Sequence, residues 1–227
     1  MADNTEEFFE DIDTFDDLEI SEDLLRGIYG FGFEVPSAIQ KKAIKPIIAG
    51  RDIIAQAQSG TGKTASFLIG SMSRVDKSNP NVQVIIICPN RELANQIKFN
   101  FDAFNTYLEL TSALIMGGTS VEQNFKDLDR GVQVVIGTPG RIYDMMRRYA
   151  LKTNSLKCFV MDEADEMLSR GFKDQLCDIF RFISSDAQIC LFSATMPEFA
   201  LDITGKFMNN PLKILVQTDM ITLEGIK

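Results

Sequence analysis

Seven short runs of aliphatic and β-branched residues recur along this chain, and they constrain its fold more than any other feature. Each run is four to seven residues long and almost entirely apolar. Continuous apolar character of this length is typical of β-strands that are buried on both faces. We therefore predict strands at residues 52–55, 82–88, 112–116, 132–137, 157–161, 187–192 and 213–216.

Apolar residues at helical spacing occupy several of the segments between these runs. Ser21 precedes an acidic first turn, as in a capped helix, and Pro36 opens a second helical stretch. Two further helices are predicted from the spacing of Leu93, Ile97, Phe101 and Phe104 and of Ile179, Phe182 and Ile183. The alternation of strands and helices predicts an α/β fold, in which a doubly wound, mostly parallel sheet carries helices on both faces of one domain.

Charge is distributed unevenly along the chain. The formal net charge is −9, but eleven of the 32 acidic residues and none of the 23 basic ones fall within residues 1–25. The remainder holds 23 basic against 21 acidic residues, a net charge of about +2. We predict that residues 1–14 form an acidic mobile tail and that the body can bind phosphates.

Composition excludes several classes of protein. Histidine is absent, which rules out hydrolases that use a Ser-His-Asp or Cys-His arrangement and makes a zinc site improbable. No apolar run approaches the roughly 18–20 residues of a membrane span, and the acidic start is unlike a secretory signal. The four cysteines are predicted to be buried, reduced thiols. We expect a soluble protein of the cytoplasm or nucleus.

A glycine-rich segment follows the first predicted strand and precedes a helical stretch. Gly60 and Gly62 let the backbone bend, so that N–H groups at the start of the helix can converge on phosphate oxygens. Lys63 would supply a cation for the phosphates, and the Thr64 hydroxyl would be a ligand for Mg²⁺. The alternative is a helix-capping loop without a ligand. The predicted phosphate-binding loop comprises Ala57, Gln58, Ser59, Gly60, Thr61, Gly62, Lys63 and Thr64.

Two carboxylates end the predicted strand at 157–161. Ligands in open α/β sheets bind at the carboxyl ends of strands, so Asp162 suits the orientation of Mg²⁺. Glu163 is the obvious candidate for polarising an attacking water. Acid pairs at strand ends are also common in solvated turns. The phosphate-binding loop elsewhere in the chain favours the functional interpretation.

The sequence Asp162-Glu163-Ala164-Asp165 resembles the motif that names the DEAD-box RNA helicases. Other motifs of that family follow in order over residues 15–227, and the whole set is similar to the first of its two RecA-like P-loop NTPase domains. Phe15 and residues 32–40 resemble the Q motif, residues 89–94 motif Ia, Gly117 and Gly118 the GG motif, residues 138–141 motif Ib, and residues 193–195 motif III.

The resemblance implies roles for individual residues and the cofactors ATP and Mg²⁺. Glu163, Lys63 and Asp162 would be catalytic, with Thr64 and Asp162 as metal ligands. Phe15, Phe33 and Gln40 would join residues 57–64 in binding ATP, with Gln40 pairing with the adenine edge. Ser193 and Thr195 would couple the two sites through Asp165. The RNA backbone would be held, without base specificity, by Pro89, Arg91, Gly117, Gly118, Thr138 and Arg141.

The resemblance also implies the domain organisation. Residues 15–217 would form the RecA-like domain and residues 218–227 the start of an interdomain connection, while the second RecA-like domain, with its catalytic arginines, would be absent. Within the family, residues 23–44, 162–168 and 221–227 resemble translation initiation factor 4A and its relatives. Asn90 stands where the family usually has threonine, which predicts an altered detail of the RNA groove.

These features lead to three hypotheses of function. The first is the ATP-binding half of an RNA helicase in translation initiation or messenger RNA processing, nearly inactive alone. The second is a non-catalytic domain that binds initiation-factor or exon-junction scaffold proteins. The third, a P-loop ATPase unrelated to RNA, is disfavoured by Gln40 and residues 138–141. We expect a monomeric domain with no membrane partner.

Overall fold

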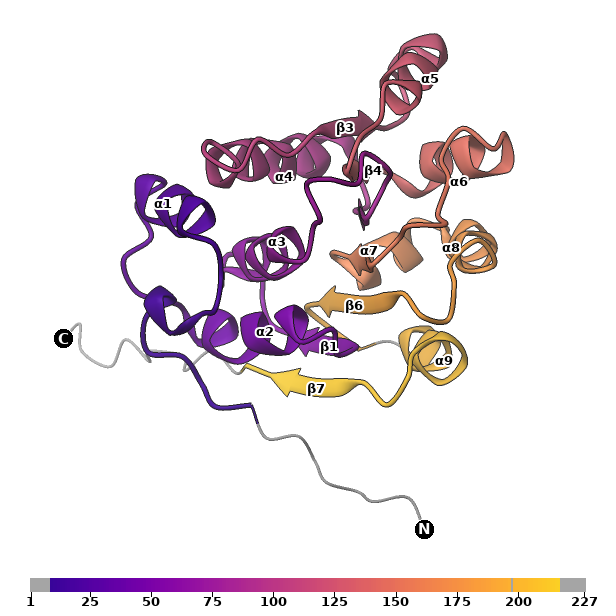
Figure 1. Cartoon of the computed structure of the whole chain (residues 1–227). Helices are drawn as coiled ribbons and strands as arrows, with labels where there is room; N and C mark the ends of the chain where they lie inside the picture. The colour runs from indigo at the N-terminus through magenta and orange to yellow at the C-terminus, as the bar shows by residue number, and fades with distance from the viewer. Residues whose placement is uncertain (1–8, 197, 217–227) are drawn as a thin grey trace, which may run out of the picture.

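The computed structural model describes residues 9–196 and 198–216, and a seven-stranded sheet runs through its centre (Figure 1). All recorded strand pairs are parallel, and the spatial order is β3-β4-β2-β5-β6-β1-β7. Every strand lies within two residues of its predicted bounds. The strands are β1 (Ile53–Gln56), β2 (Val84–Ile87), β3 (Ser112–Ile115), β4 (Val134–Gly137), β5 (Cys158–Met161), β6 (Gln188–Ser193) and β7 (Leu212–Leu215).

Helices cover both faces of this sheet, as the doubly wound prediction requires (Figure 1). Successive strand residues point to opposite faces, so Val84 and Ile86 join one buried cluster while Ile85 and Ile87 join the other. The first cluster includes residues of α1 (Glu22–Gly30), α2 (Ala38–Ile48), α3 (Lys63–Ser73) and α4 (Arg91–Phe104). The second includes or contacts residues of α5 (Val121–Asp129), α6 (Pro139–Arg147), α7 (Ala164–Ser169), α8 (Lys173–Phe180) and α9 (Glu198–Phe207).

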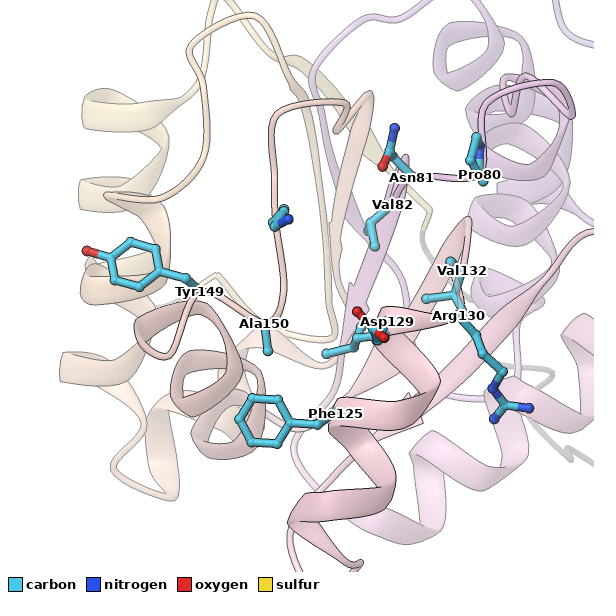
Figure 2. A pocket seen from close by; sticks show the side chains of 12 residues that line it. Pro80, Asn81, Val82, Phe125, Asp129, Arg130, Val132, Tyr149 and Ala150 are labelled. Atoms are coloured by element: carbon cyan, nitrogen blue, oxygen red, sulfur yellow. The ribbon is translucent and has the colours of Figure 1, made fainter.

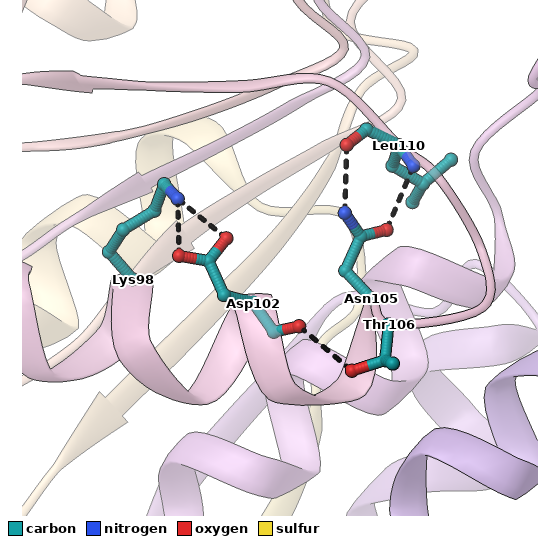
Figure 3. A network of polar contacts seen from close by, with 5 residues as sticks. All are labelled: Lys98, Asp102, Asn105, Thr106 and Leu110. Atoms are coloured by element: carbon teal, nitrogen blue, oxygen red, sulfur yellow. Dashed lines mark hydrogen bonds and ion pairs between the residues drawn. The ribbon is translucent and has the colours of Figure 1, made fainter.

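Helix α4 is fixed at its carboxyl end by a side-chain amide (Figure 3). Asn105 Nδ2 donates to the Leu110 carbonyl and Asn105 Oδ1 accepts from the Leu110 N–H, both at 2.8 Å. Lys98 and Asp102 form an ion pair one turn earlier, and the Thr106 hydroxyl donates to the Asp102 carbonyl. These bonds fix the carboxyl end of α4.

The amino-terminal segment departs from its prediction. Residue 14 was the predicted end of the tail, yet Ile12 is fully buried and its N–H donates to the Lys41 carbonyl at 3.3 Å. Asp17 accepts from the N–H groups of Asp13 and Thr14 just before the short 3₁₀ turn η1 (Phe15–Asp17). Ile12 is thus part of the domain core, while residues 1–8 and the predicted connection at 218–227 lie outside the described residues.

The four cysteines are free thiols. Cys88, Cys158 and Cys190 are buried as predicted, whereas Cys177 is only half-buried because it lies on the partly exposed helix α8. Within residues 9–196 and 198–216, none of the helices has the length and apolar character that a membrane crossing demands.

Candidate functional site

The predicted site residues gather along one edge of the sheet, where the parallel strands end. Because β5, β6 and β1 are neighbours, the D-E-A-D segment, the S-A-T segment and the phosphate-binding loop lie together. Because β3, β4 and β2 are neighbours, the other three motifs form a second group beside them. The strand order therefore divides this carboxyl edge into two halves that meet between β2 and β5.

Hydrogen bonds from Ser37 and Gln40, at the start of α2, hold the phosphate-binding loop. Gly62 begins α3 with a φ of 100°, a conformation that L side chains rarely adopt, and any Cβ there would collide with the Gln40 amide. Gln40 Nε2 donates to the Gly62 carbonyl at 3.4 Å, and Ser37 Oγ donates to the Thr61 carbonyl at 2.8 Å. The loop thus keeps its shape through bonds from a distant segment.

Lys63 is a buried cation without a hydrogen-bond partner. Its side chain is 6% exposed, and within the described residues Nζ contacts no acceptor at bonding distance. A buried charge without a partner is costly, so groups of this kind normally meet a ligand or an opposite charge. The orphaned ammonium at the start of α3 fits the binding of an anion such as a nucleotide phosphate.

Asp162 and Glu163 follow β5 in an environment that disfavours their ionised forms. Burial raises the pKa of Asp162 to about 6, an effect that the nearby Lys63 charge opposes. Burial, a hydrogen bond to Glu166 and the Asp162 charge raise the pKa of Glu163 to about 7. Glu163 also has a left-handed backbone, with φ 52°, which is strained for a residue with a side chain. Its carboxyl group can therefore exchange a proton near neutral pH.

A metal site at this position would have few protein ligands. No group of three or more metal-binding acidic or thiol side chains occurs in the described ranges. Mg²⁺ commonly needs no such group, because it keeps several waters and binds one or two protein oxygens together with substrate phosphates. Thr64, on the first turn of α3, and the buried Asp162 fit that donor set.

Asp165 is joined to the segment that follows β6. Thr195 donates to Asp165 Oδ2 from its hydroxyl at 2.8 Å and from its backbone N–H at 2.9 Å. The Asp165 N–H donates to Ser193 Oγ at 3.2 Å. Although burial opposes them, these bonds hold the pKa of Asp165 below its ordinary value. The three residues with a predicted coupling role are thus in direct contact, and Thr195 makes the side-chain bond.

In the second half of the edge, Arg91 of motif Ia contacts Gly118 of the GG motif. Asn90 caps α4 by accepting from the Leu93 N–H at 2.8 Å, which places Arg91 in the first turn. Gly118, with φ 82°, lies directly against the Arg91 guanidinium, so a side chain there would be strained and would displace the guanidinium. Asn90 therefore supplies a helix cap, a role that threonine could also perform.

The residues of motif Ib contact the GG motif as well. Thr138, the residue before α6, is buried, and its hydroxyl accepts from the Gly117 N–H at 3.5 Å. Arg141 donates to Asn124 Oδ1 at 2.6 Å and to the Thr119 carbonyl at 3.1 Å. Bonds between the ends of β3 and β4 thus fix this part of the edge.

Two of the predicted site residues are buried in the described structure. Phe15 is fully buried and meets the Phe33 ring edge-on at 6.2 Å, so it supports Phe33. Pro89 is buried where β2 ends. Phe33 itself stacks on Phe31. The nucleotide and RNA contacts of Phe15 and Pro89 stay predictions.

Hollows in the surface include one along each half of the carboxyl edge. The nucleotide cleft, as we call the first, is lined by Ser59, Lys63, Glu163, Asp165, Glu166, Ser169, Ala194 and Thr195. The arginine cleft is lined by Asn90, Arg91, Glu92, Asn95, Met116 and Arg170. Sequence reasoning missed Glu166 and Arg170, although their spacing of four residues was a signal for an ion pair on one helix face. Ser37 lies within the residues that resemble the Q motif but had no predicted role of its own, and nothing local pointed to Asn124.

Comparisons with known proteins agree with this geometry. The family model described as DEAD/DEAH box helicase matches residues 37–203. The chain is 55% identical to eukaryotic initiation factor 4A of Caenorhabditis elegans, over 95% of this chain and 54% of that protein. It is 54% identical to the ATP-dependent RNA helicase eIF4A of Mycosarcoma maydis, over 95% of this chain and 53% of that protein. The chain spans about half the length of the curated relatives it matches.

Solved structures share the fold. A DEAD box protein from the hyperthermophile Methanococcus jannaschii superposes with a TM-score of 0.88 at 37% identity, covering 91% of this chain and 57% of that one. A variant of S. cerevisiae Dbp5 bound to Gle1 and IP6 superposes with a TM-score of 0.82 at 34% identity, covering 92% of this chain and 54% of that one. The RecA-like arrangement predicted from the motifs is thereby confirmed.

Proposed function

This chain belongs to the DEAD/DEAH box helicase family, and we propose that it is the ATP-binding half of an ATP-dependent RNA helicase that acts in translation initiation. The observation that carries the proposal is the buried Lys63 ammonium without a partner, in a cleft that also holds Glu163 and Asp165. The identity with the initiation factor 4A relatives supports this role over other messenger RNA processes. We place the protein in the cytoplasm on the same ground.

Several residues in and near the nucleotide cleft would have separate roles in the binding and hydrolysis of ATP. Lys63 would bind phosphate oxygens, with the N–H groups of the loop around Gly62 beside it. Mg²⁺, held by Thr64 and through water by Asp162, would neutralise part of the phosphate charge. Glu163 would accept a proton from the attacking water at its carboxylate, which suits a group with a pKa of about 7. Phe33 and Gln40 would select adenine.

The second half of the edge would hold single-stranded RNA by its backbone. Arg91, Gly118 and Arg141 lie at the ends of neighbouring strands, where cationic side chains and exposed backbone can follow a line of phosphates. Such contacts carry no base information, so the binding would be independent of sequence. The Asp165–Thr195 bond would transmit changes between the two halves. A scaffold protein of translation initiation is the protein partner that we propose.

RNA-stimulated ATP hydrolysis tests the proposal. The 227 residues alone should hydrolyse ATP negligibly, because a second RecA-like domain would supply the arginines that stabilise the transition state, a contribution of about 10³–10⁵ in related P-loop enzymes. Fusion to the second domain of a close relative should produce RNA-stimulated turnover. Glu163→Gln in the fusion should remove turnover and keep ATP binding.

The Glu163→Gln variant is also the control for contamination. Substantial RNA-stimulated turnover by the 227 residues alone, lost in Glu163→Gln, would show that one domain suffices and would contradict the two-domain proposal. A fusion that binds RNA but never hydrolyses ATP would favour a non-catalytic scaffold.

A further inference from the structure

Helix α7 forms the wall between the nucleotide cleft and the arginine cleft. It follows β5, whose neighbours in the sheet are β2 on one side and β6 on the other. Glu166, on this helix, lines the nucleotide cleft, whereas Arg170, immediately after the helix, lines the arginine cleft. One helical turn therefore links the two clefts through two side chains of opposite charge.

The two side chains form an ion pair that uses little of the guanidinium. Arg170 Nε and Nη2 lie 2.8 and 2.5 Å from the same oxygen, Glu166 Oε1. The Arg170 side chain is 50% exposed and that of Glu166 is 33% exposed. A guanidinium carries five N–H donors, so those not directed at Glu166 remain available to another acceptor. Exposed pairs at this spacing are weak, and a phosphate can compete with them.

The arginine cleft has the chemistry of a phosphate site. Two guanidinium groups line it, Arg91 from the first turn of α4 and Arg170 from the end of α7. Asn90 and Asn95 add side-chain amides, and Glu92 is the one acidic residue among its lining residues. Guanidinium groups bind phosphate oxygens through paired N–H donors. The cleft adjoins the row of Arg91 and Gly118, so a strand lying along that row would pass within reach of Arg170.

We propose that Arg170 is a further RNA-binding residue, which exchanges its ion pair with Glu166 for a phosphate of the bound strand. The inference rests on the RNA groove of the proposed function and extends it to a residue outside the family motifs. RNA binding would thus free the Glu166 carboxylate, which lines the nucleotide cleft, and so would link RNA binding to that cleft.

Fluorescence anisotropy with a labelled single-stranded oligouridylate tests this assignment on the 227-residue chain. Arg170→Gln should weaken binding by roughly 3- to 10-fold and lower the slope of log K against log salt by about 0.7, the value for one phosphate contact on a single strand. The matched control is Arg181→Gln, because Arg181 also forms an exposed ion pair on a nearby helix, with Asp178 at 2.9 Å, and lines neither cleft. Its affinity and slope should stay unchanged.

A second variant has the opposite expected sign. Glu166→Gln removes the competing carboxylate, so it should tighten RNA binding by about 2-fold in the native background. In the Arg170→Gln background the same change should have little effect, which distinguishes exchange of the ion pair from a general loss of negative charge. Circular dichroism melting of each variant shows whether it is folded, and Arg170→Lys should retain part of the affinity.

The outcomes separate this inference from the proposed function. Weaker binding in Arg91→Gln with unchanged affinity and slope in Arg170→Gln would overturn the role of Arg170 and leave the RNA groove intact. Failure of the native chain to bind the oligonucleotide at low salt would overturn both. At matched ionic strength, inorganic phosphate should displace RNA more strongly from the native chain than from Arg170→Gln. Equal or weaker displacement from the native chain would also contradict a specific phosphate site at Arg170.

Discussion

The two edges of the sheet use polar side chains in opposite ways. At the carboxyl edge, Lys63 is buried without a partner, and Asp162 and Glu163 have pKa values of about 6 and 7. At the amino edge, Gln83, Gln133 and Gln188 lie at the starts of β2, β4 and β6, and the buried Asp52 carboxylate before β1 accepts from the Ile189 N–H at 2.8 Å. The carboxyl edge thus leaves the Lys63 ammonium without a partner, whereas these side chains at the amino edge are hydrogen-bonded.

The amino-edge glutamines bond to the loops that lead into the sheet. Gln133 Nε2 donates to the carbonyls of Lys77 and Asn79 at 3.1 and 3.2 Å, and Gln133 Oε1 accepts from the Thr111 N–H at 3.0 Å. Gln83 Nε2 likewise donates to the Asn79 carbonyl at 2.9 Å. Buried amides of this kind stabilise the fold only while all their bonds are made.

The amino edge also has a hollow, but its lining differs from that of the nucleotide cleft (Figure 2). Val82, Val132, Phe125 and Ala150 line it together with the charged side chains of Asp129, Arg130 and Lys152. Among the described residues, the two buried side-chain atoms without a partner are Lys63 Nζ and Gln175 Oε1, and neither residue lines it. An unsatisfied charge, and not a hollow by itself, therefore distinguishes the functional edge.

The largest expected effect tests the charged edge. Lys63→Ala should weaken ADP binding by roughly 10- to 150-fold, which corresponds to the 1.5–3 kcal/mol of a hydrogen bond to a charged group. The melting temperature should stay the same or rise, because the native Lys63 ammonium has no partner to lose. Calorimetric titration and thermal melting measure the two effects. Unchanged ADP affinity in a folded variant would remove Lys63 from the nucleotide site.

The matching change at the amino edge should affect stability and not binding. Gln133→Leu removes the bonds to the backbone groups of Thr111, Lys77 and Asn79 and leaves those groups without this partner. A loss of about 1–3 kcal/mol in the free energy of unfolding is expected, with ADP affinity unchanged. Urea denaturation checks the stability. Equal loss of ADP affinity in Gln133→Leu and Lys63→Ala would break the distinction between the two edges.

The sequence predicted the fold well because the signals for it are local. The strands coincide with short, mostly apolar runs, and Gly62 and Lys63 follow the first of these runs. Parallel strands place their carboxyl ends together, so the grouping of Lys63, Asp162 and Thr195 followed from the motifs. The pairing of Asp165 with Thr195 was predicted for the same reason.

Contacts between distant segments had no such signal. Ile12 looked like part of an acidic tail, yet it is buried beside α2, and the edge-on contact of Phe15 with Phe33 had no local signal. The bond from Gln40 to the Gly62 carbonyl joins residues 22 positions apart. Packing of this kind depends on the assembled core, which a pattern of neighbouring residues does not determine.

A smaller effect concerns pH. Burial raises the pKa of Glu163 from 4.5 to about 7, so its contribution to stability is present below about pH 4.5 and is lost as pH rises through 7. Glu163→Gln should therefore melt above the native protein at about pH 8 and close to it at about pH 5.

Asp144 provides a control of opposite sign for Glu163. Hydrogen bonds and charges of Arg148 and Arg147 lower the pKa of Asp144, so Asp144 stabilises the fold above its unfolded pKa and loses that effect as pH falls. Asp144→Asn should thus lower the melting temperature at neutral pH. If the difference in melting temperature between Glu163→Gln and the native protein is the same at every pH, the raised pKa of Glu163 is contradicted.

The smallest expected effect is a difference in stability between changes at the two ends of α4, one of which lies at each edge of the sheet. Asn90 caps the first turn with one oxygen, a role that threonine performs nearly as well, so Asn90→Thr should change the free energy of unfolding by only a few tenths of a kcal/mol. Asn105 uses both its oxygen and its nitrogen on Leu110, and a hydroxyl group cannot replace that pair. Asn105→Thr should cost about 1 kcal/mol, measured by urea denaturation beside Asn90→Thr. A larger loss in Asn90→Thr would mean that the amide at the carboxyl edge does more than cap the helix, with its hydrogen bond to Glu166 as the next contact to remove.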